Sequence, residues 1–152
     1  MTQPKAKLLA ISSPGGHWIQ LNRLCKQLEN RYDIIYAMPD ALFKPQQNTR
    51  VYSIVDVSAD DKWRLLPCAL QVLYILLKER PKAILSTGAA PGAVAIGLGK
   101  LLGIRTIWVD SIANVKQLSR AGRLVQKHAD VFLTQWQHLS DGQTVLFKGA
   151  VL

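Results

Sequence analysis

The sequence predicts an α/β fold, a doubly wound and mostly parallel sheet with helices on both faces. Short apolar runs alternate with helix-like runs along most of the 152 residues. The apolar runs lack strict alternation with polar residues, as expected for strands that are covered on both faces. The loops after three of these runs are rich in small or polar residues. This pattern is typical of parallel sheets in which ligands bind at the carboxyl ends of the strands.

The predicted strands are short runs rich in Ile, Val, Leu and Ala. They cover residues 8–12, 33–37, 51–55, 83–86, 106–109 and 131–134, with a further candidate at 144–147. We expect each to pair in parallel with its neighbours, because helix-like segments separate them. Residues 38–50 are the least regular stretch and predict a long loop with two prolines.

Helical patterns fill the intervals between the strands. They cover residues 17–28, 62–79, 91–102 and about 116–127. Pro67 lies near the start of the second pattern, where proline is tolerated best. The third pattern is small and apolar, and we expect Gly97 and Gly99 to let it pack closely on the sheet.

The composition indicates one globular domain, residues 1–152, with a strongly basic balance. The chain is 49% hydrophobic and 19% charged, which argues against a disordered chain. Nineteen Lys and Arg against ten Asp and Glu give a formal charge of +9, which favours an anionic partner: nucleic acid, a phospholipid surface or a phosphorylated substrate. The basic residues are dispersed and no nucleic-acid motif accompanies them, so we expect no nucleic-acid partner.

Cysteine usage and apolar runs bear on the compartment. Cys25 and Cys68 lie far apart without metal-ligand spacing, so we expect core thiols in a reducing cytoplasm and no metal site. The N-terminal segment has a short apolar run, "LLAI", which predicts a first strand instead of a signal peptide or anchor. The longest apolar stretch, residues 65–77, is interrupted by Gln71 alone and is too short to cross a bilayer as a helix.

The first candidate loop is "SSPGGH", residues 12–17. Gly15 and Gly16 let the backbone approach a ligand closely, and the helix that follows offers unpaired N–H groups. The loop lacks the spacing of a dinucleotide motif or a P-loop, so neither NAD nor ATP is predicted. A tight strand-to-helix turn is the alternative interpretation. His17 is well placed for acid–base chemistry, although a single histidine is more often inert.

Residues 86–92 and 110–114 are the other two candidate loops. Pro91 suits a first helical turn, and the N–H groups before it could hold a pyrophosphate or a sugar hydroxyl. Asp110 could orient a sugar hydroxyl or cap the next segment. The basic residues that follow it are spaced by four, which fits either a solvated face or an anion-binding face. They are Lys116 with Arg120, and Arg123 with Lys127.

The helix over residues 62–79, "KWRLLPCALQVLYILLKE", has an apolar middle framed by basic and aromatic residues. That composition suits a helix lying in a membrane interface, and an ordinary buried helix is the alternative. On the first interpretation the membrane contacts are Trp63, Arg64, Lys78 and Arg80. Anionic lipids attract basic residues near their surface by about 1 kcal/mol each.

Three segments together resemble the acceptor-side subunit of split GT-B glycosyltransferases. They are "SSPGGHWIQLNRL", residues 86–136 and the final "KGAVL". This family includes bacterial exopolysaccharide proteins of the PssD type. It also includes the membrane-recruiting subunit of the eukaryotic transferase that adds the second N-acetylglucosamine to dolichol pyrophosphate. The N-terminal half of MurG is a more distant resemblance. The similarity covers nearly the whole chain, and residues 86–136 are its most specific part.

The resemblance implies a Rossmann-like domain equivalent to the N-terminal half of a GT-B glycosyltransferase. A partner subunit would supply the C-terminal half and bind the UDP-sugar. This chain would receive a polyprenyl-pyrophosphate-linked acceptor at an anionic membrane surface, as a peripheral protein on the cytoplasmic, inner face of the plasma membrane. No cofactor or metal is implied. The alternative is a membrane-recruiting scaffold that carries no catalytic residue of its own.

The resemblance also implies roles for individual residues. Its catalytic candidates are His17, as the first choice of base, and Asp110. The corresponding acidic position in MurG-like relatives is usually Glu, so Asp110 is one methylene shorter. The candidates for binding acceptor or phosphate lie in the same three loops. They are Ser13, Gly15, Gly16, Gly88, Gly92, Ser111 and Asn114.

Overall fold

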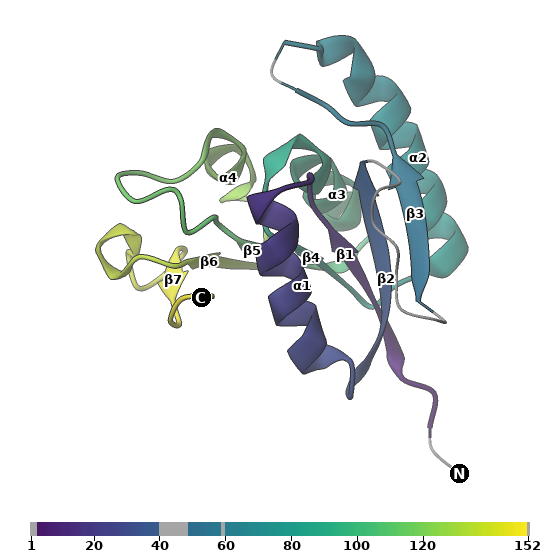
Figure 1. The fold of residues 1–152 in the computed structure, drawn as a ribbon, viewed down its shortest axis with the longest axis horizontal. Coiled ribbons are helices and arrows are strands. Elements are labelled where there is room, and N and C mark those ends of the chain that lie inside the picture. Colours follow the sequence, from purple (N-terminus) through teal and green to yellow (C-terminus); the bar gives the residue numbers. More distant parts are fainter. Residues whose placement is uncertain (1–2, 40–48, 59, 152) are drawn as a thin grey trace.

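The computed structural model describes residues 3–39, 49–58 and 60–151. In these ranges, seven strands form one sheet in the order β3-β2-β1-β4-β5-β6-β7 (Figure 1). Every neighbouring pair is parallel. The predicted α/β fold with a doubly wound parallel sheet is therefore confirmed.

The observed elements follow the predicted ones closely. The strands are β1 Ala6–Ile11, β2 Tyr32–Pro39, β3 Arg50–Ile54, β4 Ala83–Ser86, β5 Arg105–Val109, β6 Val131–Thr134 and β7 Leu146–Phe147. The α-helices are α1 Gly16–Leu28, α2 Leu65–Glu79, α3 Ala89–Leu101 and α4 Arg120–Val125. Short 3-10 turns lie at η1 Lys62–Arg64 and η2 Gln137–Leu139. Of the predicted loop at 38–50, residues 40–48 lie outside the described residues.

The alternation of side chains along β1 divides the core into two layers. Leu9 and Ile11 face the layer that α2, α3 and α4 cover. Leu8 and Ala10 face the layer that α1 covers (Figure 1). Because both faces are covered, the strands need no polar face, which explains their continuous apolar runs.

Both cysteines lie in these layers, as predicted. Cys25 and Cys68 are fully buried and unpaired. Burial raises the pKa of the Cys25 thiol to about 12. Within the described residues, no helix combines the length and apolar character needed to cross a membrane.

Two helical predictions need correction. The fourth helix was expected over residues 116–127, but α4 begins at Arg120 and ends at Val125. The Ser119 side chain caps it by accepting from the Gly122 N–H, so Lys116 precedes the helix and shares no helical face with Arg120.

The predicted close packing of α3 on the sheet is confirmed for Gly99, where a Cβ would lie 2.4 Å from Ile84. It is wrong for Gly97, since nothing lies within 4 Å of a Cβ there.

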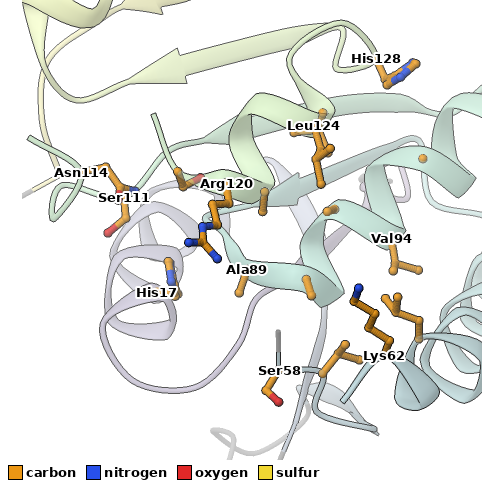
Figure 2. Close-up of a pocket in the computed structure, with 18 of the residues that line it drawn as sticks. His17, Ser58, Lys62, Ala89, Val94, Ser111, Asn114, Arg120, Leu124 and His128 are labelled. Atoms are coloured by element: carbon orange, nitrogen blue, oxygen red, sulfur yellow. The ribbon is translucent and has the colours of Figure 1, made fainter. Parts of the chain in front are cut away.

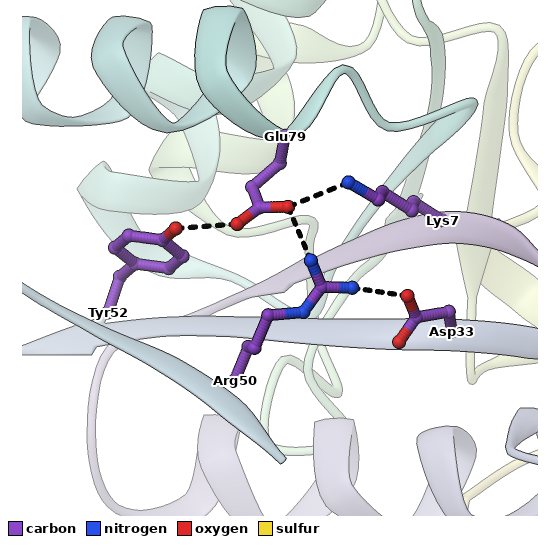
Figure 3. Close-up of polar contacts among 5 residues, drawn as sticks. All are labelled: Lys7, Asp33, Arg50, Tyr52 and Glu79. Atoms are coloured by element: carbon purple, nitrogen blue, oxygen red, sulfur yellow. Dashed lines mark hydrogen bonds and ion pairs between the residues drawn. The ribbon is translucent and has the colours of Figure 1, made fainter. Parts of the chain in front are cut away.

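The amino edge of the sheet is closed by ion pairs (Figure 3). Glu79, the last residue of α2, is 6% exposed and pairs with Lys7 at 3.0 Å and Arg50 at 2.7 Å. The Tyr52 hydroxyl donates to its other oxygen at 2.6 Å. Arg50 also pairs with Asp33. This cluster ties the end of α2 to β1, β2 and β3, and the Tyr52 hydrogen bond, with the two cations, lowers the pKa of Glu79.

Candidate functional site

The sheet reverses its winding between β1 and β4, and the loops after these two strands meet at that point. His17 Nδ1 lies 3.0 Å from the Thr87 carbonyl oxygen. The Thr87 hydroxyl in turn donates to the His17 carbonyl at 2.6 Å. A carbonyl can only accept, so Nδ1 carries the proton and Nε2 is the nitrogen able to accept one. In open α/β sheets this switch point is where ligands bind.

The glycines of the second loop serve packing within the chain. A Cβ on Gly88 would lie 2.5 Å from His17 Nδ1, so the imidazole occupies the space that a side chain would need. A Cβ on Gly92 would lie 2.0 Å from Ser86 Oγ. Ala89, between them, has a φ of 65°, a left-handed conformation that costs about 1–2 kcal/mol in a residue with a Cβ. The loop is therefore built around His17, and internal packing alone explains Gly88 and Gly92.

The glycines of the first loop are different. Gly15 and Gly16 are exposed, and nothing lies within 4 Å of a Cβ at either position. Gly15 has a φ of 82° and provides no side-chain cap for α1, so the first N–H groups of the helix have no partner from the cap residue. Ser13 is half-buried, and its carbonyl accepts from the Ser12 hydroxyl. Of the predicted phosphate-binding glycines, these two have open space in front of them.

Asp110 is a buried structural carboxylate at 1% exposure. Its Oδ1 accepts from Trp108 Nε1 at 3.0 Å and from the Ser119 hydroxyl. Its Oδ2 accepts from the Ser119 N–H at 2.9 Å and from Asn114 Nδ2 at 3.3 Å. Four donors occupy the two oxygens, and they fix the loop that leads into α4. This geometry does not favour Asp110 as a base, since accepting a proton would disrupt the loop.

A buried amide pair behind this loop was not anticipated from the sequence. Gln20 of α1 donates to the Ser111 hydroxyl at 3.3 Å and accepts from the Ile112 N–H. Gln135 donates to Gln20 and to the Asp110 carbonyl, and its oxygen accepts from the Val151 N–H at 2.7 Å. The pair thus joins α1, the 110–114 loop and the final residues. The one available signal was a polar residue on the otherwise apolar face of the first predicted helix.

A cavity of about 770 Å³ opens beside His17 (Figure 2). Of the predicted catalytic and acceptor-binding residues, His17, Ser111 and Asn114 line it. The others do not: Asp110, Ser13, Gly15, Gly16, Gly88 and Gly92. Arg120 joins them from the first turn of α4. Its side chain reaches toward His17 and Ala89 in Figure 2. An imidazole, a guanidinium and two small polar groups therefore converge at one end of the cavity, a set suited to an anionic ligand that carries a reactive hydroxyl.

Residues 63–151 match the protein family described as "Oligosaccharide biosynthesis protein Alg14 like". A UDP-N-acetylglucosamine transferase subunit ALG14 from Cryptococcus neoformans is 41% identical over 56 residues, which cover 35% of this chain and 24% of that protein. The matched segment thus spans about a quarter of that relative's length.

Solved structures with the same fold belong to larger chains. Acinetobacter baumannii MurG aligns over 95% of this chain and 46% of its own, with a TM-score of 0.76 and 14% identity. A UDP-N-acetylglucosamine 2-epimerase from Rickettsia bellii aligns over 96% and 45%, with a TM-score of 0.71 and 15% identity. At such low identity these likenesses establish the fold alone, a Rossmann-like domain of the kind that forms half of MurG.

Proposed function

The chain belongs to the Alg14-like family of oligosaccharide biosynthesis proteins, and from this membership we propose that it is one subunit of a two-component glycosyltransferase. A partner subunit binds a UDP-sugar and completes the cleft. This chain binds the acceptor, a saccharide on a polyprenyl diphosphate. The curated relative's description as a UDP-N-acetylglucosamine transferase subunit supports UDP-N-acetylglucosamine as the donor and a partner as part of the enzyme.

The geometry of His17 is the observation that supports a catalytic role for this chain within the two-component enzyme. With Nδ1 committed to the Thr87 carbonyl, Nε2 serves as the base for the acceptor hydroxyl. The hydroxyl oxygen attacks the anomeric carbon of the donor, the bond from that carbon to the UDP oxygen breaks, and the proton passes to Nε2. A base so placed contributes about 10²–10⁴-fold in rate.

The remaining loop residues bind and position the acceptor. Gly15 and Gly16, which have open space around them, and Ser13 lie on the side of the acceptor phosphates, and Ser111 and Asn114, which line the cavity, contact the acceptor sugar. Asp110 acts through Ser119 and Asn114 as a positioning residue. Gly88 acts by leaving space for the imidazole. Gly92 does the same for Ser86.

We also propose that α2 rests on an anionic membrane, on the cytoplasmic face of the plasma membrane. Trp63 is 89% exposed. Further large apolar side chains recur along the exposed side of the helix at intervals of three or four residues. They are Leu66, Leu70, Tyr74 and Leu77. Arg64 and Lys62 flank this stripe at one end, and Lys78 and Arg80 flank it at the other, an arrangement that suits a lipid interface.

The test is transfer of labelled N-acetylglucosamine from its UDP donor into the lipid fraction. The assay compares this chain alone, a candidate C-terminal-half partner alone, and both chains together on vesicles that carry the polyprenyl-diphosphate acceptor. Label in the lipid with both chains, and with neither alone, is the expected result. No label under any condition with an authentic partner would contradict the proposal.

A non-catalytic recruiting scaffold is the second candidate function. The observation that favours it is Asp110, since one of two predicted catalytic groups is committed to structure. On this alternative the partner alone transfers sugar to a soluble acceptor at the full rate, and this chain increases the rate only on vesicles. On the first proposal, transfer to the soluble acceptor also requires both chains.

A further inference from the structure

The cavity beside His17 continues as a groove along the outward side of α3 (Figure 2). One wall comes from Leu65 of α2 and from Val57, and the other comes from Leu124 and Val125 of α4. The floor consists of small apolar residues that recur along one side of α3. They are Ala89, Ala90, Ala93, Val94 and Gly97.

An outward helix side in a globular protein is normally polar. The opposite side of α3, with Ala95 and Ile96, is buried against the sheet. The groove side carries no charged or polar side chain, and Lys100 is the one charged residue of the helix. Apolar surface on both sides predicts that a second apolar partner covers the groove.

Gly97 is a glycine within α3 that packing among the described residues does not require. A glycine inside a helix costs about 0.5–1 kcal/mol relative to alanine. Gly92 and Gly99 justify that cost by packing, because a Cβ at either would overlap a neighbouring side chain. At Gly97 a Cβ would meet nothing within 4 Å in the described part of the chain. The missing side chain only deepens the groove.

The polar and basic side chains near the groove lie at one end and on the rims. Arg120 and His17 stand at the end that meets the switch point, with Asn114 beside them. The Arg120 guanidinium forms no hydrogen bond or ion pair with the side chains or backbone of the described residues. Lys62 and His128 line the rims further along. The groove therefore complements a ligand with an anionic head and a linear apolar tail.

We propose that this groove binds the first isoprene units of the acceptor, with Arg120 paired to its diphosphate. The inference rests on the proposed function and extends it from the acceptor head to the tail. Leu65 lines the groove, is 40% exposed and directly precedes Leu66 of the apolar stripe of α2. A tail that leaves the groove on that side would pass directly to the surface that we propose lies on the membrane.

The test measures binding of four probes to the full chain without vesicles. The probes are inorganic pyrophosphate and geranyl, farnesyl and geranylgeranyl diphosphate, each below its micellar concentration. Affinity is expected to rise by about tenfold or more from pyrophosphate to the longest probe, because each added isoprene buries apolar surface. Gly97→Leu fills the groove, so the rise is expected to disappear while pyrophosphate affinity stays unchanged.

Two variants separate the head from the tail. Arg120→Gln is expected to weaken all four probes by a similar factor, since it removes the charge that meets the diphosphate. Leu101→Gln changes an 84% exposed residue of the same helix outside the groove, and is expected to change nothing. A thermal midpoint for Gly97→Leu at or above that of the wild type shows that the variant is folded.

An affinity that is independent of chain length in the wild type would overturn the proposal. So would a Gly97→Leu variant that keeps the full rise. Loss of partner binding by Gly97→Leu, without any isoprenoid binding by the wild type, would assign the groove to a protein helix instead. The proposed function can fail separately. Isoprenoid binding as expected, without sugar transfer by the two-chain enzyme, would support the groove as an isoprenoid site and contradict the proposed glycosyl transfer.

Discussion

The two edges of the sheet each hold a buried carboxylate, and they hold it in different ways. At the amino edge, Glu79 is neutralised by Lys7 and Arg50 and forms a closed cluster (Figure 3). At the carboxyl edge, neutral donors hold Asp110 and leave Arg120 facing the cavity. Cations are thus used internally at one edge and left for a ligand at the other. Under the proposed function, the amino edge serves stability and the carboxyl edge serves binding and chemistry.

The largest expected effect comes from His17→Gln at the carboxyl edge. In the proposed two-chain enzyme the transfer rate is expected to fall by about 10²–10⁴-fold, because the proposed base is lost. The variant also loses the hydrogen bond from Nδ1 to the Thr87 carbonyl, so the thermal midpoint of the chain should fall by a few degrees, less than for Glu79→Gln. Single-turnover transfer and calorimetry check both parts. An unchanged rate with an intact complex would favour the scaffold function.

Asp110→Asn tests whether a carboxylate at the carboxyl edge is structural. The asparagine NH₂ group would replace one carboxylate oxygen and face donors such as Trp108 Nε1 and the Ser119 N–H, which would lose their acceptor. We therefore expect the free energy of unfolding to fall by about 3 kcal/mol. Denaturant unfolding measures this change. A full loss of transfer with unchanged stability would instead make Asp110 a participant in the chemistry.

Glu79→Gln is the matched change at the amino edge. Losing the charge that pairs with Lys7 and Arg50 is expected to cost about 2 kcal/mol of stability, while the transfer rate per folded complex stays the same. The variant also predicts a pH effect. The pKa of Glu79 is lower in the folded chain than in the unfolded chain, so its stabilisation is present above pH of about 4.3 and is lost as the pH falls through the folded pKa.

The pH effect is measured as the thermal midpoint against pH. Between about pH 5 and the acid limit the wild type should lose stability more steeply than Glu79→Gln, since only the wild type has this carboxylate to protonate. Parallel curves for the two proteins would show that the cluster contributes nothing through its charge.

Gly88→Ala has the smallest expected effect. It keeps His17 and tests whether the position of its imidazole matters. The added Cβ would overlap the His17 imidazole, and we expect the transfer rate to fall by about tenfold as the proposed base is displaced. Gly99→Ala is the control, because its Cβ meets Ile84 in the core. It should lower stability by about 1–3 kcal/mol and leave the rate per folded complex unchanged. Equal rates for both variants would contradict a positioning role for Gly88.

Most of the fold could be predicted from the sequence, because covered strands leave an unmistakable pattern of short apolar runs. Residues 83–86 and 131–134 were predicted to the residue. The start of α4 was not predicted correctly. The helix begins at Arg120 instead of about residue 116, because Ser119 caps it and is held by a hydrogen bond to Asp110. No local pattern in a sequence reports such contacts.

The candidate site was predicted in location and less well in detail. His17, Ser111 and Asn114 were selected because they lie in loops that follow predicted strands, and all three line the cavity. Arg120 stood out only as part of a basic face, since its position depends on where α4 begins. The roles of Gly88 and Gly97 depend on which atoms lie beside them, and spacing along the chain carries no such information.

The most direct test of the two-edge comparison measures transfer rate and thermal midpoint for His17→Gln and Glu79→Gln in the same two-chain enzyme. We predict that His17→Gln loses the rate with the smaller fall in midpoint, whereas Glu79→Gln has the larger fall in midpoint and keeps the rate per folded complex. A normal rate for His17→Gln, or a rate for Glu79→Gln that falls with fully folded protein, would contradict the division between the two edges.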